Sequence, residues 1–235
     1  MGKGTLYMIP CPIGDTPPEQ VLPATNIEIM RSLDYFIAEE MRSARRFLSR
    51  AGMGRPIDTL QMAELNEHTP PEDIAALVEP LLAGRDAGMV SEAGVPGVAD
   101  PGAELAALCH RHGIRVVPLT GPSSILLALM ASGLNGQSFA FNGYLPVKPA
   151  ERRSAIKHFE RRAASEGQTQ IFIETPYRNA KLLEELLETC RPDTRLCIAA
   201  DISSPAEYIR TDTVAGWRKS PRPELHKRPA VFLIL

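Results

Sequence analysis

The first 120 or so residues alternate short apolar runs with segments of helical period, and this alternation restricts the fold more than any other feature. A short apolar run bounded by turn residues predicts a strand that is buried on both faces of a sheet. We expect such strands at Thr5–Ile9, Asp34–Ala38, Ala87–Val90 and Ile114–Leu119. We expect helices between them at Glu39–Ala51, Pro71–Gly84 and Ala103–His112. Strands that alternate with helices are typical of a parallel sheet covered by helices, so the first half is predicted to be an α/β domain.

The pattern changes after Gly121, where a helix of small apolar residues is expected at Ser123–Ser132. The apolar runs that follow predict strands at 139–145, 169–174, 195–201, 208–213 and 230–235. Charged or amphipathic segments between them predict helices at 151–165 and 179–189. The run at 208–213 has the character of a hairpin arm, which favours a mixed sheet. The sequence therefore predicts two α/β domains, at 1–118 and 119–235.

The charge divides at the same boundary. The net charge of the chain is −2, which excludes a global positive field for binding nucleic acid. Residues 1–118 carry 10 Lys and Arg against 16 Asp and Glu (−6), and residues 119–235 carry 16 against 12 (+4). Two segments of the second half, Lys148–Arg162 and Arg210–Arg228, each hold six cations and two acids. They predict either a surface that meets phosphates or an ordinary solvated helix face and loop.

Three loops rich in glycine and proline follow predicted strands, at Pro10–Asp15, Ser91–Gly102 and Gly121–Ser124. Ligands of open α/β sheets lie at the carboxyl ends of the strands, so the three loops are expected to converge on one site. The second loop has three glycines and two prolines in twelve residues. Ordinary strand-to-helix turns need only about 2–6 residues, which favours a ligand loop. Neither GxGxxG nor a P-loop is present, so a dinucleotide or ATP site has little support.

Other sequence features point to an intracellular protein without a metal. The four cysteines show no CxxC spacing and are predicted to be free thiols in a reducing compartment. No residue cluster has the spacing of a metal site, so no metal is expected. There is no run of 18 apolar residues and no leader-like segment at the start. We therefore expect a cytoplasmic protein that does not cross a membrane.

At its loops the sequence resembles a known family, the tetrapyrrole methylase superfamily of S-adenosylmethionine-dependent methyltransferases. Within it, the chain is most similar to the branch that 2′-O-methylates a cytidine of small-subunit ribosomal RNA. The segments that carry the resemblance are LYMIPCPIGD (6–15), IAEEMRSARRFL (37–48), VSEAGVPGVADPG (90–102), VVPLTGPSSILLALMASGL (116–134), FAFNGYLPVKPAERR (139–153) and IETPYR (173–178). The resemblance covers essentially the whole chain.

The resemblance implies two α/β domains of the tetrapyrrole methylase type, with S-adenosyl-L-methionine in a cleft between them. It also implies a homodimer. By position, the expected cofactor-binding residues are Pro12, Ser91, Gly94, Val98, Asp100, Ser123, Ser124, Leu145, Ile202, Pro229 and Ala230.

The resemblance also suggests residues for the reaction. A ribose hydroxyl must lose its proton, and the carboxylate candidates by motif are Glu39, Glu40 and Glu92; the motifs do not discriminate among them. Arg42 matches the arginine of the family and is the better candidate, ahead of Arg45, for holding a phosphate or an acidic partner. Glu40, Met41 and Glu92 differ from the residues of the branch, and residues 200–204 replace an Arg-Glu-Leu-Thr-Lys block.

Three functions stay open at this point. The first is an enzyme that methylates small-subunit ribosomal RNA. The second is a methylase of a small molecule of the tetrapyrrole type, although the loop at 10–12 lacks the glycines expected of that branch. The third is a degenerate methylase fold that binds RNA or another partner without catalysis.

Overall fold

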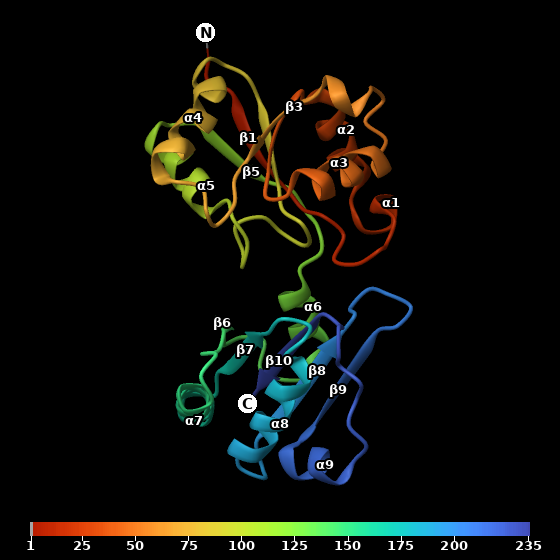
Figure 1. Ribbon diagram of the computed structural model, residues 1–235, viewed down its shortest axis with the longest axis vertical. Helices are drawn as coiled ribbons and strands as arrows, with labels where there is room; N and C mark the ends of the chain where they lie inside the picture. Colours follow the sequence, from red (N-terminus) through yellow and green to blue (C-terminus); the bar gives the residue numbers. More distant parts are fainter. Residues whose placement is uncertain (1) are drawn as a thin grey trace. The chain divides into compact units, whose positions relative to one another are not determined.

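The computed structural model describes residues 2–235 and divides into two compact units, the first ending at Ser123 and the second covering Ser124–Leu235 (Figure 1). The division falls two residues after Gly121, where the sequence pattern changes.

The first unit is built on a parallel sheet of five strands in the order β3-β2-β4-β1-β5. Its strands are β1 (Thr5–Ile9), β2 (Tyr35–Ala38), β3 (Gln61–Glu64), β4 (Ala87–Val90) and β5 (Arg115–Pro118). All their pairings are parallel, which confirms the predicted parallel sheet. The strand β3 was not predicted, because Gln-Met-Ala-Glu at the outer edge of a sheet is only half-buried and contains no apolar run.

Helices cover both faces of this sheet. They are α1 (Pro18–Val21), α2 (Ala24–Ser32), α3 (Met41–Arg50), α4 (Pro71–Leu82) and α5 (Ala103–Arg111), with a short 3₁₀ turn at Ile57–Thr59. Successive strand residues point to opposite faces, so β2 supplies two separate cores. Phe36 packs in a cluster with residues of α2 and α3, whereas Ile37 packs with residues of α4 and α5. Burial on both sides explains why the central strands are continuous apolar runs.

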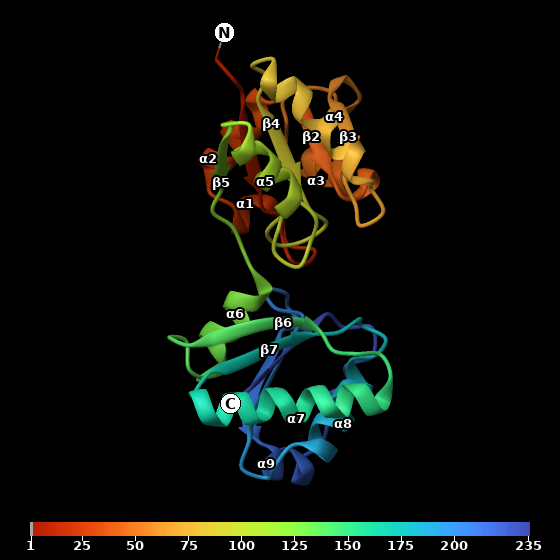
Figure 2. The ribbon, with the colours of Figure 1, turned by 90° about the vertical axis from the view of Figure 1, so that its left-hand side faces the viewer.

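The second unit contains a mixed sheet in the order β6-β7-β10-β8-β9, as predicted. Its strands are β6 (Phe139–Tyr144), β7 (Thr169–Ile173), β8 (Arg195–Ala200), β9 (Tyr208–Thr213) and β10 (Ala230–Ile234). Its helices are α6 (Ser124–Ser132), α7 (Pro149–Glu166), α8 (Asn179–Thr189) and α9 (Val214–Lys219). The pair β6–β7 is parallel and the other pairs are antiparallel. Figure 2 shows α6 on one side of this sheet and α7 and α8 on the other.

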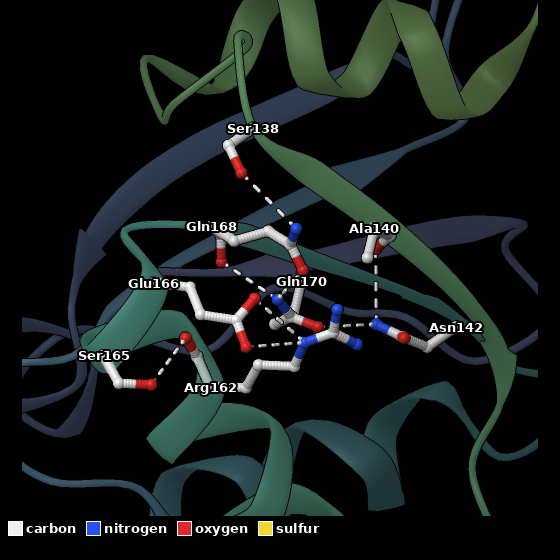
Figure 3. A network of polar contacts seen from close by, with 8 residues as sticks. All are labelled: Ser138, Ala140, Asn142, Arg162, Ser165, Glu166, Gln168 and Gln170. Atoms are coloured by element: carbon white, nitrogen blue, oxygen red, sulfur yellow. Dashed lines mark hydrogen bonds and ion pairs between the residues drawn. The ribbon is translucent and has the colours of Figure 1, made fainter.

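A chain of amide hydrogen bonds joins the two strands at one edge of the second sheet (Figure 3). Asn142 Nδ2 donates to Gln170 Oε1 at 3.1 Å, and Gln170 Nε2 donates to Gln168 Oε1 at 2.9 Å. Gln168 Nε2 donates in turn to Ser138 Oγ at 3.3 Å. Gln170 is fully buried, so its amide needs these partners. The ladder holds β6 against β7 up to the irregular pairing between Phe141 and Tyr144, just before the loop that begins at Leu145.

The four cysteines are buried free thiols, as predicted. Burial raises the pKa of Cys109 to about 11, so this thiol stays protonated and unreactive near neutral pH. No helix among residues 2–235 is long and apolar enough to span a membrane.

Candidate active site

Three loops of the first unit meet at Gly94. The backbone of Gly94 exchanges two hydrogen bonds with Cys11, at 2.7 Å and 3.2 Å. A Cβ built on Gly94 would lie 3.5 Å from Ile13 Cγ2 and 3.8 Å from the Pro122 carbonyl oxygen. Gly94 is therefore in close contact with the loop after β1 and with the loop after β5. The predicted convergence of the three loops is confirmed.

A second close approach joins the first and third loops. A Cβ added to Gly121 would lie 2.2 Å from Pro10 Cγ, which is well inside van der Waals contact. Only glycine permits this approach. The Pro and Gly residues of these loops thus serve to bring backbones together at the carboxyl edge of the sheet.

The loop at 91–102 needs its glycines for conformation as well. Gly94, Gly97 and Gly102 have φ angles of 73°, 79° and 127°, in the region that favours glycine. Within the loop, Ser91 is buried and Asp100 is half-buried, while Val98 is 47 % exposed. The loop therefore presents both a polar and an apolar side chain from an unusually folded backbone.

A group of carboxylates lies at the same edge. The backbone N–H of Glu92 donates to Glu39 Oε2 at 3.4 Å, and Ser43 Oγ donates to Glu92 Oε1 at 3.1 Å. Burial and the Glu39 carboxylate raise the pKa of Asp100 to about 6, against a smaller opposite effect of the Ser91 hydroxyl. Burial, together with the charges of Glu92 and Glu67, also raises the pKa of Glu39. A raised carboxylate pKa indicates a site that favours a bound proton or another positive charge.

Glu40 has a different environment from its neighbour Glu39. It is the N-cap of α3, and its carboxylate accepts hydrogen bonds from the backbone N–H groups of Arg42 and Ser43 at 3.0 Å and 2.7 Å. These two bonds lower the pKa of Glu40. Glu40 therefore serves as the helix cap. The Glu40 carboxylate is thus engaged by the first N–H groups of α3. Arg42 is exposed on the first turn of that helix.

A cavity of about 430 Å³ opens beside these groups in the first unit. It lies between the loop after β1 and one face of α3. Its lining is formed by Cys11, Pro12, Gly14, Asp15, Pro18, Ser43, Arg46, Phe47, Arg50 and Glu92. The lining residues that the sequence analysis did not predict include Ser43, Arg46 and Arg50 of α3. Their spacing of three and four residues along one helix face was the available signal, but it does not by itself show which face meets a cavity.

The predicted residues of the second unit share an edge of its sheet. Leu145 directly follows β6 and Ile202 lies just beyond β8, while Ala230 is the first residue of β10. Because β10 runs antiparallel to β8, Ala230 pairs with Ala200, and the Asp201 N–H donates to the Pro229 carbonyl at 3.0 Å. Leu145, Ile202 and Ala230 are at most 8 % exposed. Ser124, also expected at the cofactor, is the first residue of α6, and Ser123 is buried just before it.

The replaced block at 200–204 is held by an ion pair. Arg228 Nε donates to Asp201 Oδ2 at 2.5 Å, and both side chains are largely buried. Asp201 and Ser203 adopt φ angles of 48° and 66°, so the block is a tight turn. An acidic residue here thus anchors the segment that leads into β10.

The basic segments are not the uniform surface that their composition suggested. Arg152 is buried and forms a bidentate ion pair with Glu185. Its Nη2 donates to Glu185 Oε1 at 2.8 Å, and its Nε donates to Oε2. Arg210 pairs with Asp212 and lies 4.5 Å from the centre of the Trp217 ring. Neither alternative predicted for the segment Lys148–Arg162, a phosphate-binding surface or a solvated helix face, holds for Arg152, because its charge is neutralised inside the unit. The exposed cations of α7 are Arg153, Lys157 and Arg161, spaced four residues apart.

Comparison with known proteins identifies the family. The family model described as Tetrapyrrole (Corrin/Porphyrin) Methylases matches residues 5–216. The chain belongs to this family. It is also 31 % identical over 209 residues to "Ribosomal RNA small subunit methyltransferase I" of Vibrio cholerae, covering 89 % of this chain and 68 % of the relative. A protein of the same name from Xylella fastidiosa is 32 % identical over 232 residues, with 99 % and 81 % covered.

Solved structures of tetrapyrrole methylases share the fold. The methyltransferase CobJ aligns with a TM-score of 0.64 at 18 % identity, covering 99 % of this chain and 94 % of that one. The uroporphyrin-III-C-methyltransferase of Thermus thermophilus aligns with a TM-score of 0.54 at 22 % identity, with 98 % and 91 % covered. Family and fold together confirm the predicted methyltransferase, and the family implies a methyl-donor cofactor. Among the described residues, no group of three or more His, Cys, Asp and Glu side chains is arranged to hold a metal ion.

Proposed function

We propose that this tetrapyrrole methylase transfers the methyl group of S-adenosyl-L-methionine to the 2′-hydroxyl of a cytidine in small-subunit ribosomal RNA. The names of the relatives supply the substrate class. The observation that carries the proposal is the meeting of three ligand loops at Gly94, next to carboxylates and a cavity.

The chemistry of the site fits such a donor. S-adenosylmethionine carries two positive centres, a sulfonium and an ammonium, and supplies an activated methyl group when bound. Asp100 and Glu39 have raised pKa values, so a nearby positive charge stabilises their ionised forms. The glycines of the second loop let backbone N–H and C=O groups approach a ligand closely. In the second unit, Leu145, Ile202, Pro229 and Ala230 would contribute mainly backbone groups, since three of them are buried.

Glu39 is the best candidate for the general base. The Glu40 carboxylate is held by two backbone N–H groups, which lower its pKa and its affinity for a proton. Burial raises the pKa of Glu39, which makes its carboxylate a stronger base. In this proposal, Glu39 accepts the proton of the ribose hydroxyl, and Glu92 is kept in place by the Ser43 hydroxyl.

The cavity beside Glu92 is our candidate for the acceptor nucleotide. Arg46 and Arg50 line the cavity from α3, and Arg50 also pairs with Asp15 at 2.7 Å. Guanidinium groups suit phosphate, so these two residues would hold the backbone of an unstacked nucleotide. Arg42, on the first turn of the same helix, stays a predicted phosphate contact.

The exposed face of α7 is proposed as a second phosphate contact. Arg153, Lys157 and Arg161 follow one another at intervals of about 6 Å along the helix axis. Three such cations would give RNA binding a salt-dependent component without sequence preference.

The test is labelled methyl transfer to under-methylated small ribosomal subunits, followed by nucleoside analysis for 2′-O-methylcytidine. Glu39→Gln should lower kcat by about 10²- to 10⁴-fold while S-adenosylhomocysteine still binds in a calorimeter. Glu40→Gln is the matched control and should keep most of kcat, because its main effect is on the helix cap. A wild-type chain that binds S-adenosylhomocysteine but methylates no ribosomal RNA would refute the proposed acceptor. Full activity of Glu39→Gln would refute the proposed base.

The homodimer stays a prediction from the family resemblance, and the cytoplasmic location stays a prediction from the sequence pattern. Light scattering of the purified chain at several concentrations measures its oligomeric state. Cell fractionation measures its location in the cell.

A further inference from the structure

A surface of the second unit combines an exposed aromatic ring with an exposed lysine, and it is formed by two segments that are distant in the sequence. Tyr177 is 70 % exposed, the largest exposed fraction among the aromatic residues of the described chain. Its ring packs edge-to-face on the His226 imidazole, with 5.9 Å between ring centres. Exposed Lys227 follows His226 directly, whereas Arg178, next to Tyr177 in the sequence, is ion-paired with Glu174 at 2.6 Å. We name this surface the Tyr177 platform.

Hydrogen bonds join the two chain segments that carry the platform. The Lys227 N–H donates to the Pro176 carbonyl at 3.1 Å, and Asn179 Nδ2 donates to the Arg228 carbonyl at 2.6 Å. Leu225 is fully buried in the core of the unit and anchors the turn that carries His226. A rigid aromatic loses little conformational entropy when a ligand stacks on it.

The segment beneath the platform has an unusual number of unpaired polar atoms. Among the described residues, four buried side-chain polar atoms have no hydrogen-bond partner, and three of them belong to this segment: Glu174 Oε2, Arg178 Nε and Asn179 Oδ1. Buried polar groups are normally paired, and exceptions require an explanation. The three atoms belong to the segment that runs from Glu174, just after β7, to Asn179, the first residue of α8.

We propose that the Tyr177 platform stacks an unpaired base of single-stranded RNA, with Lys227 contacting the adjoining phosphate. This inference rests on the proposed function, because it assigns part of that RNA to a surface. An exposed ring of tyrosine offers a flat face to any base, and the exposed Lys227 ammonium is complementary in charge to a phosphate. The sequence did not reveal this surface, because Tyr177 and His226 are 49 positions apart in the chain and come together only in the fold.

Fluorescence anisotropy with two labelled RNA probes tests the proposal. One probe is a single-stranded oligocytidylate of about 12 nucleotides, and the other has the same phosphates but abasic riboses. The full chain, saturated with S-adenosylhomocysteine, should bind the first probe about tenfold more tightly than the second. Tyr177→Ala should remove this preference without changing the affinity for the abasic probe. Tyr177→Phe should retain the preference.

Two further variants separate stacking from charge and from general damage. Lys227→Ala should weaken the binding of both probes equally and reduce the slope of log K against log salt by about 0.7. Phe139→Ala removes another exposed aromatic of the same unit and should keep the base preference. Equal binding of the two probes by the wild type, or a base preference that survives in Tyr177→Ala, would overturn the inference.

The experiments distinguish failure of the platform proposal from failure of the proposed function. If small ribosomal subunits are methylated and Tyr177→Ala still prefers bases, the function stands and the platform is wrong. If no ribosomal RNA is methylated but Tyr177→Ala loses its base preference, the platform stands and the acceptor assignment is wrong.

Discussion

The acidic side chains near the sheet edge have different surroundings in the two units. In the first unit, Glu39 and Asp100 lie among other acids, and burial raises the pKa of both. In the second unit, the acids near the sheet edge are matched by arginines, as in the pairs of Glu174 with Arg178 and of Asp201 with Arg228. Glu39 and Asp100 of the first unit are thus ionised less readily than ordinary carboxyls, whereas the charges of Glu174 and Asp201 in the second unit are neutralised by arginines.

This difference teaches that net charge is a poor guide to where a charged ligand binds. The first half of the chain carries −6 and the second half +4, which suggested that cations of the second half meet phosphates. Several of those cations pair with acids inside their own unit instead, and Arg152 is the clearest case. The acids of the first unit, in contrast, would suit the cationic methyl donor that we propose, because burial and neighbouring acids raise the pKa of Asp100 and Glu39.

The largest expected effect is on the stability of the second unit. Arg152→Ala should lower the free energy of unfolding by about 3–5 kcal/mol, because it leaves the Glu185 carboxylate buried without its partner. Arg153→Ala, the exposed neighbour, should change it by about 0.5 kcal/mol or less. Urea denaturation measures both variants. Equal effects at the two positions would break the proposed distinction between internal and surface cations.

A double variant sharpens this point. Replacing both partners by apolar residues, as Arg152→Met with Glu185→Leu, should recover most of the lost stability. Persistent destabilisation of the double variant would show that the pair does more than neutralise its own charges.

A smaller effect is expected at the loops of the first unit. Gly121→Ala should destabilise the chain by about 1–3 kcal/mol and weaken S-adenosylhomocysteine binding, because the new methyl group would overlap Pro10. Gly136→Ala is the matched control, since a Cβ there meets no atom within 4 Å. Thermal unfolding and calorimetry measure the two consequences. Unchanged binding by Gly121→Ala would separate the close approach of these loops from the methyl-donor site.

The smallest expected effect concerns pH. The pKa of Asp100 is raised to about 6, above the value of about 3.9 in an unfolded chain, so the folded state binds this proton more tightly. The stabilisation is complete below about pH 4 and is lost as the pH rises through about 6. Asp100→Asn removes this titration, so its stability relative to wild type should rise between pH 4 and 6 and then stay level. A stability difference that does not vary with pH would show that the folded state does not raise the pKa of Asp100.

Much of the fold could be predicted from local patterns. The apolar runs of β1, β2 and β4 follow from burial on both faces, and the glycine loops follow from backbone demands at the strand ends. The half-exposed β3 gave no such pattern. In the candidate site, Glu39, Glu40 and Glu92 were found together, but the motif alone could not separate a helix cap from a base.

The sequence by itself determined the class of fold, the family and the loops at which a ligand is expected. These properties depend on residue type and spacing over short distances, which a single chain displays directly. Only the tertiary structure decided which acids stay unpaired, which cations are buried and which aromatic ring is exposed. Arg152 meets Glu185 across 33 positions and Tyr177 meets His226 across 49, so their environments exist only after the chain has folded. Burial and pairing set the energy of a charge, and neither is a local property of sequence.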